Sequence, residues 1–256
     1  MNEQLPRPGH TAWLALQRDA HAWFSGPLGG LLLSRQQRLL AEQLDALFGS
    51  FLLHYGFAGA GLPPLQQLSH SVRLGAPLPG VEIACEEDAW PVLEHAADVV
   101  LLQHALDFAV SPHQLLREAA RCVRPGGHLL VVGIHPRSLW GLRHFLAGDV
   151  LAQARCISPA RLADWLRLLG FALEKRRFGC YCPPLSSQRW QARLLGIEPW
   201  AQDLQLPGGG FYLLTARKLV AGLRPLPQPR RATVSPLRPV PVAKVGRHPG
   251  SKHNHE

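Results

Sequence analysis

The chain has 256 residues, 46% of them hydrophobic and 18% charged, which is the composition of a globular protein long enough to bury a full core. No apolar run approaches the roughly 18 residues that a membrane span needs, and the N-terminus lacks the basic and apolar segments of a secretory signal. The net charge is +9, but seven Lys or Arg and one acid lie from Leu223 onward, so this tail carries +6 and the rest +3. The basic charge is therefore no evidence that the folded part binds nucleic acid.

The five cysteines are an odd number without disulfide or zinc spacing. Cys180 and Cys182 form the one close pair, and their alternation suits a strand better than a metal site. We therefore expect reduced thiols, no metal and a cytoplasmic location.

The first elements are helical. Residues 1–30 are expected to form an N-terminal extension with at most one short amphipathic helix, because the sequence GPLGG at 26–30 breaks it. Leucines at helical spacing predict a better helix over 31–47.

Three strands are expected next, over 50–55, 69–74 and 81–85. A glycine-containing loop, 56–61, follows the first of them. No Asp or Glu occurs between Asp45 and Glu82, and the acidic stretch Glu86-Glu87-Asp88 follows the third strand.

The most regular stretch is 97–140. A continuous apolar run, 98–102, predicts a strand buried on both faces. Ser111 and Pro112 supply a helix start, and the sequence RPGG at 124–127 is expected to end that helix and turn the chain into a second buried strand, 128–133. Strand, helix and strand in this order form one right-handed parallel unit.

A further helix is predicted from Ser158-Pro159 to Gly170, and two strands over 171–182 and 210–219, separated by a segment containing Trp190–Gly196. Few residues of the Pro-rich tail, 223–256, can form a core, so we expect it to be disordered. The folded domain is expected to span 31–222.

The stretch LLREAARCVRPGGHLLVVG, together with the acidic loop before it, resembles class I S-adenosylmethionine-dependent methyltransferases of the methyltransferase type 11 branch. The order of elements follows this family over roughly residues 45–219, and the motifs are specific over about 85–140. The alternative is that a helix-Pro-Gly-Gly-strand unit suits any parallel α/β domain. The resemblance implies an α/β fold with a doubly wound, mostly parallel seven-stranded sheet, Rossmann-like, whose last strand is antiparallel.

The resemblance also implies S-adenosylmethionine as cofactor and a loop for it after the first strand. The family pattern there is an acid, one further residue and alternating glycines, which let the backbone pass close to the cofactor. Gly56, Gly59 and Gly61 are identified as cofactor-binding residues on this basis. Their spacing is irregular, and His54 stands where the acid is expected.

The family places a second carboxylate at the end of the second strand, where it bonds both ribose hydroxyls. The predicted strand 69–74 ends instead in Arg73 and Gly75. Replacing a charge-assisted hydrogen bond by a neutral one costs on the order of 1 kcal/mol. We therefore expect weakened but not abolished cofactor binding.

Two further segments carry family roles. The acidic loop resembles the family's D-A-x-x-L-P motif, so Asp88 would accept from the adenine amino group and the Ala89 amide would meet a ring nitrogen; the alternative is a solvated acidic loop with Trp90 in the core. Gln103 and His104 follow the fourth strand, where the family contacts the methionine part of the cofactor. His104 is either a general base or, more in keeping with methyl transfers that need only alignment, a structural or neutral pocket histidine.

The loop after the fifth strand, 134–141, resembles the family's N-P-x-S-x-W-G loop on the substrate side, where His135 or Arg137 would orient an acidic substrate; the alternative is a surface loop capped by Trp140. We expect a methyltransferase acting on an unidentified acceptor. The alternative is a catalytically inactive binding or scaffold protein of the same fold, associated with RNA through its tail by weak, salt-sensitive contacts.

Overall fold

The computed structural model of the chain describes residues 10–57, 61–146, 148–184 and 208–220. The chain divides into one compact unit, Met1–Gly222, and a second, Leu223–Glu256. The second unit, with the predicted tail, and the segment Trp190–Gly196 lie outside the described residues. Within the described part, no helix has the length and apolarity to cross a membrane.

Seven strands form one sheet: β1 (Gly49–Gly56), β2 (Leu68–Gly75), β3 (Ile83–Ala84), β4 (Ala97–Gln103), β5 (Val123–Ile134), β6 (Phe171–Gly179) and β7 (Phe211–Lys218). The helices are α1 (His10–Ser25), α2 (Pro27–Leu44), α3 (Pro112–Cys122), α4 (Leu139–Leu146), α5 (Pro159–Leu168) and a short 3₁₀ turn, η1 (Val150–Gln153).

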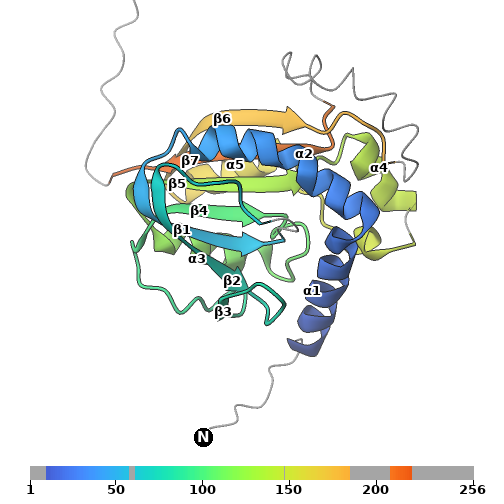
Figure 1. Cartoon of the computed structure of the whole chain (residues 1–256), viewed down its shortest axis with the longest axis horizontal. Helices are drawn as coiled ribbons and strands as arrows, with labels where there is room; N and C mark the ends of the chain where they lie inside the picture. Colours follow the sequence, from blue (N-terminus) through green and yellow to red (C-terminus); the bar gives the residue numbers. More distant parts are fainter. Residues whose placement is uncertain (1–9, 58–60, 147, 185–207, 221–256) are drawn as a thin grey trace, which may run out of the picture. The chain divides into compact units, whose positions relative to one another are not determined.

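The strand order is β3-β2-β1-β4-β5-β7-β6. β1 to β5 pair in parallel, and β7 is inserted antiparallel between β5 and β6. The predicted doubly wound sheet with an antiparallel last strand is confirmed (Figure 1). The order reverses between β1 and β4, and ligands of open α/β sheets bind outside the carboxyl ends of the strands at such a point.

Each face of the sheet has its own core. Val100 and Leu102 of β4 pack on one face with side chains of α3 and α5. Val99 and Leu101 point to the other face, against α2. All four side chains are fully buried, because alternate residues of a strand face opposite sides and helices cover both faces of this sheet.

The Pro-Gly-Gly segment was predicted to form a turn between helix and strand, but it lies within the strand. α3 does end at Cys122, but β5 begins at once, with Val123 paired to Ala97, and the pairing resumes only at His128 opposite Val99. Residues 124–127 therefore form a bulge inside β5, where Gly126 has a φ of +80°, a left-handed conformation that favours glycine. The predicted third strand is also shorter than expected, two residues instead of five.

The two N-terminal helices pack against the sheet domain. α1 buries Trp13, Ala20 and Phe24. The expected break over residues 26–30 and helix start at residue 31 are wrong, because α2 already begins at Pro27 with Gly26 as its N-cap, and proline suits the first helical position. Figure 1 shows α1 beside the carboxyl ends of the parallel strands, whereas α2 runs across one face of the sheet.

Candidate active site

The turn after β1 lies against the end of β4. Gly56 has a φ of +131°, and a Cβ there would overlap the carbonyl oxygen of Gln103. The N–H of Phe57 donates to the same oxygen at 3.1 Å. Only glycine fits such a position, so the first glycine of the predicted loop is needed for the chain to leave β1. Gly61 has a φ of +84°, and Gly59 lies outside the described residues.

A buried polar network follows β4. The amide Nε2 of Gln103 donates to Oε1 of Gln36 on α2 at 2.9 Å. Nε2 of Gln36 lies 2.6 Å from Nε2 of His104. On the other side of the ring, Nδ1 of His104 lies 2.9 Å from Oδ2 of Asp107, which also accepts from the N–H of Ile134. The network joins α2, the end of β4 and the end of β5.

The amide orientation of Gln36 sets the tautomer of His104 in this network. Gln36 uses its oxygen to accept from Gln103, so its amide nitrogen faces His104 and donates. Nε2 of His104 therefore accepts, and Nδ1 carries the hydrogen that is donated to Asp107. An imidazole with a carboxylate at Nδ1 can act as a general base through Nε2 once the hydrogen bond from Gln36 to that nitrogen is broken.

His104 also has an unusual backbone. Its φ is +55°, which is uncommon for a non-glycine residue and costs on the order of 1 kcal/mol or more. Its N–H donates to the carbonyl of Val132 on β5 at 2.9 Å. This hydrogen bond stabilises the unusual conformation, which places the imidazole at the carboxyl end of β4.

Aromatic side chains close the site over His104. The Phe24 ring of α1 stacks on the imidazole with centroids 4.9 Å apart, and on Phe57 at 5.0 Å. Phe108 meets both phenyl rings edge-on. His104 is completely buried as a result, so a ligand can reach its Nε2 only when α1 and α2 move.

His54 occupies the position where the family resemblance implies an acid. It is fully buried, and burial together with the charge of Arg73 lowers the pKa of His54 to about 3. The side chain of the neighbouring Gln103 lies close enough to His54 to raise its pKa, which opposes the larger effect of burial, although no hydrogen bond of ordinary geometry joins the two side chains. His54 is therefore a neutral, poorly solvated imidazole below the site.

The acidic loop after β3 has an exposed part and a buried part. Asp88 and Ala89 are exposed, and the charges of Glu87 and Asp88, together with burial, raise the pKa of Tyr55 at the end of β1. The loop is therefore close to the turn after β1. Trp90 is buried and stacks on Tyr55 at 5.2 Å with the rings nearly parallel.

Glu87 of this loop is buried, in contrast to the alternative of a solvated acidic loop. Its carboxylate accepts from the N–H groups of Val110 and Ser111, at 3.0 and 2.9 Å, just before α3. Ser111 is the N-cap residue as predicted, but its side chain makes no capping hydrogen bond. Glu87 holds the two residues before the helix, where a negative charge is favourable.

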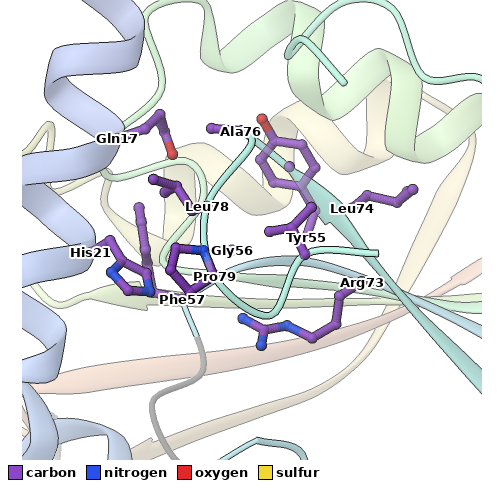
Figure 2. A pocket seen from close by; sticks show the side chains of 12 residues that line it. Gln17, His21, Tyr55, Gly56, Phe57, Arg73, Leu74, Ala76, Leu78 and Pro79 are labelled. Atoms are coloured by element: carbon purple, nitrogen blue, oxygen red, sulfur yellow. The ribbon is translucent and has the colours of Figure 1, made fainter. Parts of the chain in front are cut away.

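A small hollow lies where β1 and β2 end (Figure 2). Its lining includes Tyr55 and Gly56 of β1, Arg73 of β2, and Gln17 and His21 of α1. The enclosed space is about 10 Å³, room for roughly one water molecule. α1 thus narrows this end of the site as well.

The loop after β5 lies at the other end of the same sheet edge. His135 is buried against Phe178, with ring centroids 5.3 Å apart, and its Nδ1 lacks a partner in the described part of the chain. Burial and the charges of Arg137 and Arg176 lower the pKa of His135. Trp140 is buried and donates to the carbonyl of Cys182 at 2.9 Å, so the alternative of a loop held by a buried tryptophan is also observed.

Sequence reasoning missed three residues that build the site: Gln36, Phe24 and Asp107 in its role as partner of His104. Asp107 carried a signal, since an acid three residues after a histidine places both side chains within reach. Gln36 carried a weaker one, as a polar residue on the apolar side of its helix. Phe24 had none, because its contacts are with residues more than 30 positions away.

Comparisons with known proteins bear on the family and the fold of this chain. A family model described as "Methyltransferase domain" matches residues 66–131. The uncharacterized protein YafS of Escherichia coli is 32% identical over 163 residues, covering 61% of this chain and 67% of that protein.

Two solved structures share the fold. One is a chain from the complex between the Trm112 methyltransferase activator of Haloferax volcanii and a methyltransferase, with a TM-score of 0.54, 13% identity, and coverage of 82% of this chain and 100% of that one. The other is an S-adenosylmethionine-dependent methyltransferase of Thermotoga maritima, with a TM-score of 0.51, 18% identity, and coverage of 82% and 94%.

Proposed function

The chain belongs to the class I S-adenosylmethionine-dependent methyltransferases, in the methyltransferase type 11 family, and from this membership we propose that it binds S-adenosylmethionine and transfers the methyl group to an acceptor molecule. The observation that carries the proposal is the strand order reversing between β1 and β4, with Gly56 held against Gln103 at that point. When bound, the cofactor supplies a methyl group on a sulfonium, which is open to attack by a nucleophile.

The residues fit such a cofactor at two of its parts. The exposed Asp88 and Ala89 would hold the adenine, and the loop that starts at Gly56 would pass along the middle of the molecule. Gln103 and His104, at the carboxyl end of β4, would face the methionine part. The fit is poorer at the ribose, where Arg73 replaces a carboxylate.

His104 is the proposed general base. Its Nε2 would accept the proton that an acceptor hydroxyl or amine loses on methylation, and Asp107 would stabilise the imidazolium through Nδ1–H. In the structure this nitrogen accepts from Gln36 and lies beneath Phe24. Binding would therefore have to displace these two side chains before the base can act.

The loop after β5 is the proposed acceptor side. Arg137 and Arg176 are exposed, and both act on the buried His135. Two positive charges at this end of the strands would favour an acceptor that carries a negative group.

Calorimetric titration with S-adenosylmethionine tests the proposal. We expect saturable binding, weakened at least tenfold in Gly56→Val, in which a branched side chain is forced against Gln103. The control is Gly148→Val, because a Cβ at Gly148 would meet nothing within 4 Å. The proposal is wrong if millimolar cofactor gives no heat.

A second experiment tests the base. In His104→Gln we expect cofactor affinity within a few-fold of the wild type but loss of methyl transfer from labelled cofactor into a metabolite extract. His113→Gln, at an exposed histidine on α3, serves as the control. Equal transfer by His104→Gln and wild type would remove the base from the proposal.

A further inference from the structure

The hollow at the ends of β1 and β2 presents a cation to its ligand. Arg73 lines it, half-buried, together with His21 of α1. Figure 2 shows the Arg73 side chain extending from β2 at the lower edge of the hollow, with His21 of α1 on another side of it. No carboxylate occurs among the residues that line the hollow. An arginine in this setting is available to bind a ligand group of opposite charge.

The main chain of Gly80 lies beside the Arg73 guanidinium. A Cβ on Gly80 would come within 2.7 Å of Nη1, which is the far end of a flexible side chain. Gly80 has a φ of +80°, a conformation that favours glycine. The guanidinium therefore lies next to the turn between β2 and β3.

The nearest acid does not neutralise Arg73. Glu82 accepts from the main-chain N–H of Arg73 at 2.8 Å through Oε2, and no ion pair joins its carboxylate to the guanidinium among the described residues. The Glu82 charge raises the pKa of Arg73, while burial, the larger influence, lowers it. The guanidinium keeps its donors for a ligand.

Two neighbouring strands both lack the carboxylate that the family resemblance implies. His54 of β1 and Arg73 of β2 are direct partners in the parallel register, and they occupy the two positions where the family resemblance implies carboxylates. One carboxylate is replaced by a neutral ring and the other by a cation. In nucleotide-binding α/β folds, an acid at the end of the second strand bonds the ribose hydroxyls, whereas an arginine there accommodates a phosphate on the ribose.

We propose that this hollow is a subsite for a phosphate on the 2′ or 3′ oxygen of an adenosine ligand, with Arg73 as the residue that recognises it. The proposal rests on the proposed function, because it assigns a further group to the same nucleoside pocket. Arg73 donates two parallel hydrogen bonds to the phosphate oxygens. Entry of the ligand requires the same movement of α1 that frees His104.

The test compares five ligands by calorimetry on the full chain: adenosine, its 2′-, 3′- and 5′-monophosphates, and S-adenosylhomocysteine. We expect the 2′- or the 3′-monophosphate to bind about tenfold to a hundredfold more tightly than adenosine, the range for charge-assisted hydrogen bonds. The 5′-monophosphate should bind no better than adenosine, and the preferred isomer identifies the oxygen that carries the phosphate.

Arg73→Glu should reverse this preference. It removes the phosphate advantage and restores a carboxylate for the ribose hydroxyls, so S-adenosylhomocysteine should bind more tightly than to the wild type. Arg73→Gln, which introduces no charge beside Glu82, should lose only the phosphate advantage, and Arg73→Lys should keep part of it. Arg117→Glu, at an exposed arginine on α3, should change neither affinity.

The outcomes separate the two proposals. If S-adenosylhomocysteine binds but all three phosphates bind like adenosine, the phosphate subsite is wrong and the methyltransferase proposal stands. If the 2′- or 3′-monophosphate binds in a manner that requires Arg73, but S-adenosylhomocysteine does not bind, the phosphate subsite stands and the methyltransferase proposal is wrong. If no ligand binds, both are wrong.

Discussion

Acid should destabilise this protein through one buried residue, His54. Its imidazole is fully buried in β1 with a pKa of about 3, against an ordinary value of 6.5. Between these two values the unfolded chain holds a proton on His54 that the folded chain does not, so the free energy of unfolding falls as the pH falls through this window. The contribution is complete above pH 6.5 and is lost progressively towards pH 3.

The magnitude follows from the two pKa values. Each pH unit inside the window costs about 1.4 kcal/mol, so lowering the pH from 7 to 5 removes about 2 kcal/mol through His54 alone. This is a large fraction of the roughly 5–15 kcal/mol by which domains are stable.

The assay is urea unfolding at pH 7 and pH 5, followed by tryptophan fluorescence, in the wild type and in His54→Leu. We expect the variant to lose about 2 kcal/mol less than the wild type over this interval. At pH 7 the variant should be as stable as the wild type or more so, because leucine removes two ring nitrogens that lack partners.

His70→Leu is the matched control, since His70 is an exposed histidine on the neighbouring β2. It should retain the pH dependence of the wild type. Equal losses of stability in His54→Leu and the wild type would refute the reasoning, because another group would then have to carry the effect.

Three further changes test the site. Gly56→Ala should destabilise the protein by about 1–3 kcal/mol, because alanine at a φ of +131° is strained and its methyl overlaps Gln103; a melting temperature equal to the wild type would contradict the tight turn. Asp88→Ala should weaken S-adenosylmethionine binding at least tenfold in calorimetry, and an unchanged affinity would remove Asp88 from the site. Glu87→Ala should lower stability by about 1–3 kcal/mol, since two N–H groups before α3 lose their acceptor; denaturant unfolding measures this, and Glu86→Ala should have a smaller effect.

The centre of the sheet was predictable because a strand buried on both faces, such as β4, consists of an unbroken apolar run. The bulge in β5 was not, because Pro-Gly-Gly suits a turn between elements and a bulge within a strand equally well. Only the pairing of Val123 with Ala97 distinguishes the two.

The part of the site that could be predicted is the position where the main chain leaves a strand. Gly56 lies at the switch point because a strand has to end there, and the structure shows why it must be glycine. The cover over His104 was not predictable, because Gln36 and Phe24 reach it from helices far away in sequence. Long-range contacts of single polar or aromatic side chains leave no periodic pattern.

The packing of Phe24 and Gln36 over His104 has a consequence for every affinity measured on this protein. If cofactor binds only to molecules in which α1 and α2 are displaced, the apparent dissociation constant is the intrinsic one divided by the fraction of such molecules. A closed state favoured by about 2.7 kcal/mol leaves about 1% of molecules competent, and turns a micromolar site into one of about 100 μM. A weak apparent affinity would then measure the free energy of closing the aromatic side chains over His104. Substitutions at Phe24 that destabilise the closed state would increase the apparent affinity for the cofactor.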